Sequence, residues 1–153
     1  MQLTQKETDL LKDLKGQEQL CVDKYRKHAA CAKDQQLVDL FNQLANAEQK
    51  HYDTIVQMES GTVPQQNGQQ SNSNSMPTFT ATYDVAETPE KKNDSYLCND
   101  LLSAEKHASH LYDTCVFEFK DENARNTLNH IQKEEQQHGK MIYDYMAANK
   151  MYA

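Results

Sequence analysis

The chain has 153 residues, the usual size of one domain, so we expect residues 1–153 to form a single domain. No apolar run approaches the roughly 18 residues of a membrane span, which predicts no transmembrane helix and no membrane partner. The net charge of −7 argues against sequence-independent binding to nucleic acid. The N-terminus has no secretory signal and the four cysteines form no C-x-x-C pair, so we expect a cytoplasmic protein with reduced thiols.

Helix start signals predict four long helices. Thr4 and Glu7 have the spacing of a capping box, and Thr88 is followed by proline at the first helical position. Asp34 and Asp121 are good N-cap residues inside two otherwise helical stretches, so each stretch is divided there. No strand pattern competes. We therefore expect an all-α chain with helices at residues 5–32, 35–59, 89–119 and 122–147.

A polar tract separates the two helical stretches. Residues 60–87 are rich in Gln, Asn and Ser, and such a tract cannot bury a core, so it is predicted to be a linker or long crossover. The helical stretches then form hairpins at residues 4–59 and 88–148. A few apolar residues of the linker are candidates for docking on the bundle: Met76, Phe79, Tyr83 and Val85.

The two hairpins are similar in sequence. Sliding the chain on itself by 87 residues aligns identical residues over much of both hairpins. The aligned pairs include Leu14 with Leu101, Glu18 with Glu105, Tyr25 with Tyr112, Asp34 with Asp121, Glu48 with Glu135, and His51 with His138. One hairpin alone cannot bury its apolar face, but two copies make a four-helix bundle.

Each predicted helix has an apolar stripe that one glutamate interrupts. The four glutamates are Glu18, Glu48, Glu105 and Glu135, and in the second helix of each hairpin His51 or His138 follows three residues later on the same face. The midpoint of the first glutamate pair is residue 33 and that of the second is residue 120, each beside a predicted cap. All four glutamates are therefore expected in one layer of the core.

Four buried carboxylates need protons, cations or metal ions, because desolvating an unpaired ion costs several kcal/mol. No Lys or Arg lies on any of the stripes, so protein cations are not at hand. Two divalent ions would balance the four charges. A glutamate from each of two helices plus Glu-x-x-His from the other two is the ligand set of di-iron and di-manganese bundles. Carboxylates with one imidazole per ion favour two Fe or two Mn ions. The alternative is a metal-free bundle with protonated carboxylates.

This pattern resembles the ferritin-like superfamily, including bacterioferritins and rubrerythrins. The resemblance implies that Glu18 and Glu105 are terminal ligands, that Glu48 and Glu135 bridge the ions, and that His51 and His138 each bind one ion. It also implies an oxidoreductase in which these six ligands are the catalytic residues. Ala108 stands where rubrerythrins have an extra carboxylate, so a rubrerythrin-type ligand switch is not expected.

The short chain, rich in Gln, Asn and Ser, also resembles the Coat F family of spore coat proteins. The shared features are a Gln-rich N-terminal helix and the sequence Glu-x-x-His-Tyr, which begins at Glu48. This resemblance implies incorporation into the spore coat, with other coat proteins as partners. The metal ions would then serve only to hold the bundle together.

We therefore carry two functional hypotheses, and whether the protein is an enzyme stays open at this point. The first is a dinuclear oxidoreductase acting on a small oxidant, hydrogen peroxide or dioxygen, as a peroxidase, catalase or ferroxidase. The second is a structural spore coat protein. Similarity to other bundles of this kind also implies a homodimer.

Other polar residues near the glutamates have simpler interpretations. Tyr25 and Tyr112 lie two turns after Glu18 and Glu105, and are either core tyrosines or hydrogen-bond donors to ligands. Cys21 is expected to be a buried core thiol. Glu134 is turned by about 100° from its neighbour Glu135, so we expect it at the surface.

Overall fold

The computed structural model describes residues 1–65 and 76–152. In this part of the chain the regular secondary structure consists of four α-helices and no strand. They are α1 (Gln5–Cys31), α2 (Gln35–Glu59), α3 (Pro89–Glu118) and α4 (Glu122–Ala148). The all-α prediction is confirmed, and each predicted helix end lies within one residue of the observed one.

All four predicted N-caps begin a helix. The Thr4 side chain accepts from the Glu7 amide while the Glu7 carboxylate accepts from the Thr4 amide, which completes the capping box. Asp34, Thr88 and Asp121 each accept a backbone amide from the first turn of their helix. These caps fix where each hairpin turns, and so they set the relative level of the paired helices.

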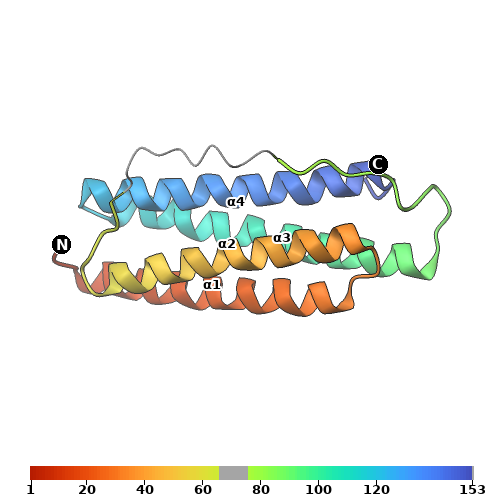
Figure 1. The fold of residues 1–153 in the computed structure, drawn as a ribbon. Coiled ribbons are helices and arrows are strands. Elements are labelled where there is room, and N and C mark those ends of the chain that lie inside the picture. The colour runs from red at the N-terminus through yellow and green to blue at the C-terminus, as the bar shows by residue number, and fades with distance from the viewer. Residues whose placement is uncertain (66–75, 153) are drawn as a thin grey trace.

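The helices pack as two antiparallel hairpins, α1 with α2 and α3 with α4, and the hairpins lie side by side as a four-helix bundle (Figure 1). Contacts between α1 and α3 and between α2 and α4 join the two hairpins. The N-terminus and the C-terminus lie at opposite ends of the bundle (Figure 1). None of the helices in the described part of the chain has the length and apolar character needed to cross a membrane.

The apolar core is divided into two clusters. One, around Tyr25, Phe41 and Tyr145, fills the end of the bundle where α1 turns into α2. The other, around Leu14 and Tyr112, fills the opposite end. The predicted glutamate layer lies between the two clusters along each helix. Buried polar groups therefore interrupt the hydrophobic interior at mid-bundle.

In the described part of the linker, three of the four residues expected to dock on the bundle contact it. Met76 and Phe79 pack on the cluster around Tyr145, and the rings of Phe79 and Tyr145 meet edge to face at 5.4 Å between centroids. The Tyr83 hydroxyl donates to Asp94 at 2.6 Å. The expectation for Val85 is wrong, because its side chain is 75% exposed. Residues 66–75 of the predicted linker lie outside the described residues.

Two buried carboxylates make contacts that the sequence did not predict, and each joins its hairpin to the turn of the other. Glu7 on α1 accepts the Lys120 amide at the α3–α4 turn. Asp94 on α3, which the 87-residue offset aligns with Glu7, accepts the amides of Lys33 and Asp34 at the α1–α2 turn. These reciprocal contacts give the two repeats a two-fold relationship and hold them in register.

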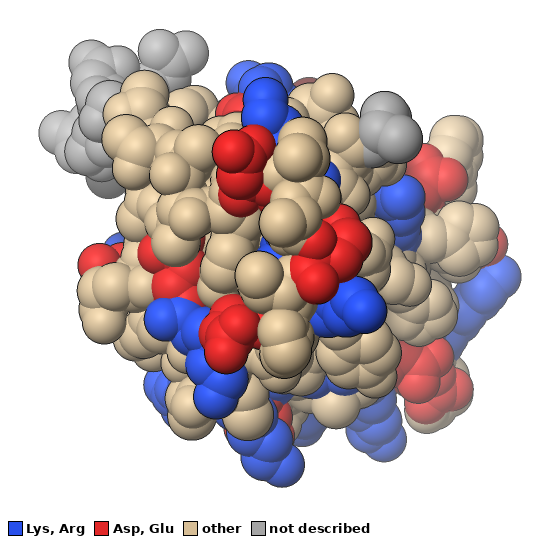
Figure 2. Space-filling view, turned by 90° about the vertical axis from the view of Figure 1, so that its right-hand side faces the viewer, with Lys and Arg blue, Asp and Glu red and all other residues tan. Residues whose placement is uncertain are grey.

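Figure 2 shows the end of the bundle that carries the α1–α2 turn, the start of α3 and the end of α4. On this face acidic and basic side chains are interspersed among neutral ones (Figure 2). The excess of negative charge in the chain is therefore not gathered into one acidic surface on this end.

Candidate metal centre

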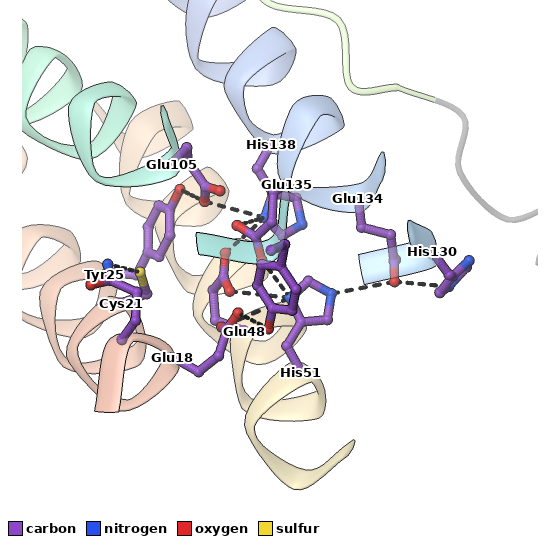
Figure 3. A network of polar contacts seen from close by, with 12 residues as sticks. Glu18, Cys21, Tyr25, Glu48, His51, Glu105, His130, Glu134, Glu135 and His138 are labelled. Carbon is purple, nitrogen blue, oxygen red and sulfur yellow. Dashed lines mark hydrogen bonds and ion pairs between the residues drawn. The ribbon is translucent and has the colours of Figure 1, made fainter. Parts of the chain in front are cut away.

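The structure brings all six predicted ligands together in one buried layer (Figure 3). Each helix contributes one glutamate, and α2 and α4 each add a histidine one turn later. The four glutamates are at most 3% exposed and the two histidines are each 4% exposed. The six residues are Glu18, Glu48, His51, Glu105, Glu135 and His138.

The layer contains two groups of four ligand atoms. One group takes an atom from each of Glu18, Glu48, His51 and Glu135, and the other from Glu48, Glu105, Glu135 and His138. Within each group the atoms lie within 4.8 Å of one another. Glu48 and Glu135 belong to both groups, so these two residues have the positions that bridging ligands would need.

Each histidine turns its Nδ1 atom toward several carboxylate oxygens. His51 Nδ1 lies 2.7 Å from Glu135 Oε1, 3.1 Å from Glu48 Oε2 and 3.9 Å from Glu18 Oε2. His138 Nδ1 lies 2.9 Å from Glu48 Oε1 and 3.2 Å from Glu105 Oε1. One ring nitrogen carries at most one proton, so it cannot hydrogen-bond to all of these oxygens at once. Atoms that share a metal ion approach one another in this way.

Several of these oxygens have no hydrogen-bond partner. While the four carboxyl groups are ionised, no donor among the described residues satisfies Glu18 Oε2, Glu105 Oε2 or either carboxylate oxygen of Glu135. The short approach of His51 to Glu135 Oε1 is therefore an ion-pair distance without hydrogen-bond geometry. Unpartnered buried oxygens are costly. Divalent ions that prefer oxygen ligands would satisfy them, so the donor set fits ions of this kind.

In the absence of metal, protons hold this layer together. Burial, and then a neighbouring carboxylate, raises the pKa of Glu18, Glu105 and Glu135 above the ordinary glutamate value. Burial also acts to raise the pKa of Glu48, but hydrogen bonds from Glu18 and both histidines outweigh it and hold that pKa well below its usual range. Glu48 is therefore the anion around which its protonated neighbours gather.

Both histidines are held as cations in this metal-free arrangement. Burial acts to lower the pKa of His51, but the carboxylates of Glu134 and Glu48 outweigh it and raise that pKa to about 10. For His138, Glu105 and Glu48 outweigh burial in the same way and raise the pKa to about 9. Metal binding would therefore have to displace protons from these ligands.

Two tyrosines donate to predicted terminal ligands. The Tyr25 hydroxyl donates to Glu105 Oε1 at 2.5 Å, and the Tyr112 hydroxyl donates to Glu18 Oε1 at 2.6 Å. Both rings are fully buried. Burial and the adjacent carboxylate raise the pKa of each phenol well above its usual value, so the hydroxyls remain protonated donors. The tyrosines are therefore buried core residues whose hydroxyls are satisfied by glutamates, and a role for them beside metal ligands stays a prediction.

Glu134 is a member of this network that the sequence analysis placed at the surface. Its Oε1 atom lies 3.3 Å from His51 Nε2 and 3.0 Å from His130 Nε2 (Figure 3). Its side chain is 29% exposed, so it lies at the edge of the bundle, but α2 approaches α4 closely enough for His51 to contact it, which was not expected. The four-residue spacing of His130 and Glu134 on one helix face was the available signal. At the 87-residue offset Glu134 aligns with Ala47, so the first hairpin lacks this carboxylate.

Cys21 and the remaining histidines lie outside the two ligand groups. Cys21 is buried, accepts from the Gln17 side chain at 3.4 Å, and has its pKa raised by burial and then by the nearby glutamates. It therefore remains a protonated thiol, as a core cysteine should. His28 pairs with Asp100 at 2.8 Å, on the side of the bundle where α1 meets α3.

The fold and the site define the protein as a four-helix bundle with a buried carboxylate–histidine layer suited to metal ions. Residues 93–153, which include α4 and most of α3, match the family model of the Coat F domain. The matched part includes Glu105, Glu135 and His138. The Coat F resemblance is confirmed there, and the ferritin-like resemblance stays a prediction. Neither the curated proteins nor the solved structures contain a significant match to the chain.

Proposed function

We propose that this protein is a spore coat component whose bundle binds two divalent metal ions, iron or manganese. The Coat F domain supports the association with the coat. The observation that carries the metal proposal is the pair of four-atom ligand groups, which share Glu48 and Glu135 in a buried layer without Lys or Arg partners among the described residues. Two divalent ions neutralise four carboxylates while both imidazoles remain neutral.

The two ligand groups indicate which of the six residues would bind each ion. Glu18 and His51 would bind one ion, Glu105 and His138 the other, and Glu48 and Glu135 would lie between them. Oxygen-rich sites with one imidazole per ion suit iron and manganese better than copper. Tyr25 and Tyr112 would orient the terminal glutamates through the hydrogen bonds described above.

The role best supported for these ions is structural. The layer separates two apolar clusters, and without cations its carboxylates must hold protons in a dry environment. Ions that bind the folded bundle and not the unfolded chain stabilise the fold. The chain has a low apolar share of 37%, so such a cross-link between four helices would matter for a protein built into a durable shell.

A second candidate function is reduction of peroxide or dioxygen, and two observations favour it. A solvent cavity between α3 and α4 is lined by Glu105 and Glu135, and two buried phenols donate to ligands. When bound, iron or manganese supplies redox chemistry toward such oxidants. The chain itself would position Glu105 and Glu18 through the tyrosines, and its apolar clusters would shield the layer from solvent at both ends of the bundle. Peroxidase, catalase and ferroxidase activities all belong to this candidate. The electrons would come from an external reductant in a peroxidase, from a second peroxide molecule in a catalase and from ferrous ions in a ferroxidase.

Metal content decides whether the centre exists. Protein produced in medium supplemented with iron and manganese is analysed for metal per chain, together with Glu48→Ala and with Glu118→Ala as a matched surface control. We expect about two ions per chain in the wild type and the control, and a marked loss in Glu48→Ala. Equal metal in Glu48→Ala and the wild type would contradict the proposal.

The same samples separate the two roles. Consumption of hydrogen peroxide by the loaded wild-type protein, lost in Glu48→Ala, would establish the oxidoreductase. Two ions per chain with no consumption of peroxide or dioxygen would support the structural role instead.

The association with the coat needs a test in cells. A fluorescent fusion of the full chain, produced in a sporulating bacterium, is expected to form a shell around the developing spore. Other coat proteins, or a second copy of this chain, would be its partners there. Fluorescence spread evenly through the mother cell would contradict the coat assignment.

A further inference from the structure

A cavity that is open to solvent reaches the glutamate layer from one side of the bundle. This α3–α4 cavity has a volume of about 480 Å³ and is lined entirely by residues of those two helices. Glu105 and Glu135, one from each helix, reach it from the buried layer, while the exposed Lys106 and His110 lie at its outer rim. The cavity therefore connects solvent with one ligand of each predicted kind, terminal and bridging.

The cavity exists where the second hairpin has small residues. Gly139 and Ser109 line it, and the 87-residue offset aligns them with Tyr52 and Val22 of the first hairpin. A methyl group added at Gly139 would lie 3.5 Å from Leu102 Cδ1, which is an ordinary contact. A larger side chain at this position would extend into the cavity. The two repeats are therefore alike in their ligands but different in the residues that flank them.

The size of the cavity suits a hydrated cation, and the polar groups in its largely apolar lining lie along its walls and at its inner end. Six waters at about 30 Å³ each occupy about 180 Å³, well within the available volume. Gln132 and Gln136 on α4 and Ser109 on α3 offer polar atoms along the walls, and two carboxyl groups form the inner end. Water ligands of an incoming ion could be exchanged for these oxygens one after another.

We propose that the α3–α4 cavity is the path by which hydrated divalent metal ions reach the buried layer. This inference rests on the proposed metal centre and specifies the route of entry. The ions would pass between α3 and α4, next to Gly139. In the first hairpin, the bulkier Tyr52 and Val22 stand at the corresponding positions.

The test is the rate of metal uptake with and without a bulky side chain in the cavity. Gly139→Tyr introduces the residue that the first hairpin has at this position. Gly16→Tyr is the matched control, because Gly16 is also inside a helix but has open space around it. Metal-free protein is mixed rapidly with Co²⁺ alone, and the visible absorption of the bound ion is followed in time. The number of ions bound at equilibrium is measured on the same samples.

Gly139→Tyr should take up Co²⁺ about tenfold more slowly than the wild type, since uptake must then wait for a local opening of the helices. The final stoichiometry should be unchanged, and Gly16→Tyr should behave as the wild type. Equal uptake rates in Gly139→Tyr and Gly16→Tyr would overturn the proposed path while leaving the centre intact. Absence of Co²⁺ binding in the wild type would instead overturn the proposed function.

Ser109→Val provides a second variant should Gly139→Tyr fail to fold, as judged by circular dichroism. It introduces the first hairpin's residue on the opposite wall of the cavity. Slower uptake with unchanged stoichiometry is again expected, and an unchanged rate in a folded Ser109→Val protein would overturn the path.

Discussion

The Tyr112 hydroxyl donates a 2.6 Å hydrogen bond to Glu18, from α3 of one hairpin to α1 of the other. The repeat-related Tyr25 donates to Glu105 in the opposite direction. Each hairpin therefore supplies a phenol to the glutamate of its partner. The residues of the candidate site are thus also among the polar contacts that hold the two halves of the bundle together.

Tyr112→Phe should destabilise the metal-free bundle. Removing the hydroxyl leaves Glu18 without its donor in a buried position, which costs about 1–3 kcal/mol of unfolding free energy. Tyr96→Phe is the matched control, because Tyr96 is 70% exposed. Urea denaturation of the three proteins measures the difference. If Tyr112→Phe and Tyr96→Phe unfold at the same urea concentration, the hydrogen bond does not contribute as we expect.

Glu134 should make the two metal positions unequal. Its carboxylate contacts the Nε2 atom of His51, and such a partner orients a histidine ligand and raises its basicity. Glu134→Ala should therefore weaken the binding of one of the two ions by about 10–100-fold and spare the other. Titration of metal-free protein with Mn²⁺, followed by calorimetry, resolves the two steps.

The opposite substitution, which adds a carboxylate, can be made at the corresponding position of the first hairpin. Ala47 occupies the position that corresponds to Glu134, so Ala47→Glu should supply a carboxylate to His138 and strengthen the second position. A Glu134→Ala protein that binds both ions as tightly as the wild type would show that the contact is only structural.

Most of the bundle could be predicted because helix periodicity and capping are local properties of sequence. The stripes that contain Glu18, Glu48, Glu105 and Glu135 are buried as expected, and the caps at Asp34 and Asp121 set the glutamates at one level. The doubled pattern made this inference firm, since each hairpin repeats the other.

The contacts that escaped prediction join residues far apart in the chain. Glu7 meets the α3–α4 turn across 113 residues, and Glu134 meets His51 across 83. Glu7 lies one turn before Leu11 on the stripe of α1, and Glu134 lies off the stripe of α4. The contact that each carboxylate makes depends on how the hairpins pack, which the sequence pattern does not reveal. For Val85 the sequence predicted a contact that the structure lacks. An apolar residue in a linker does not have to pack on the bundle, and Val85 is exposed.

Removal of metal should lower the stability of the bundle. When the free metal concentration is about 100 times the dissociation constant, metal binding at one site adds about 2.7 kcal/mol to the unfolding free energy. A strong chelator should therefore lower the melting temperature of the loaded wild-type protein, and Mn²⁺ should restore it. Glu48→Ala, which lacks a shared ligand, should melt at the same temperature with and without chelator. A wild-type melting temperature that does not respond to chelator would contradict the structural role of the ions.

Glu7 should make the stability of the bundle depend on pH in the acid range. Burial acts to raise the pKa of Glu7, but the amides of Thr4 and Lys120 outweigh it and lower that pKa below 4.5. A carboxylate with a lowered pKa in the folded state contributes stability above its unfolded value, and this contribution is lost as the pH falls through the folded value. In Glu7→Gln, one of the two acceptor oxygens is replaced by an NH₂ group that faces a backbone donor.

Glu7→Gln should therefore unfold more easily than the wild type at pH 7, by about 1–3 kcal/mol. The difference should shrink as the pH is lowered below 4.5 toward about pH 3, because the wild-type carboxylate is then protonated as well. Thermal unfolding followed by circular dichroism across this range measures it. Glu90→Gln, at an exposed position in the first turn of α3, should show little difference at any pH. A Glu7→Gln deficit that stays constant from pH 7 to about pH 3 would mean that the ionised carboxylate is not the stabilising form.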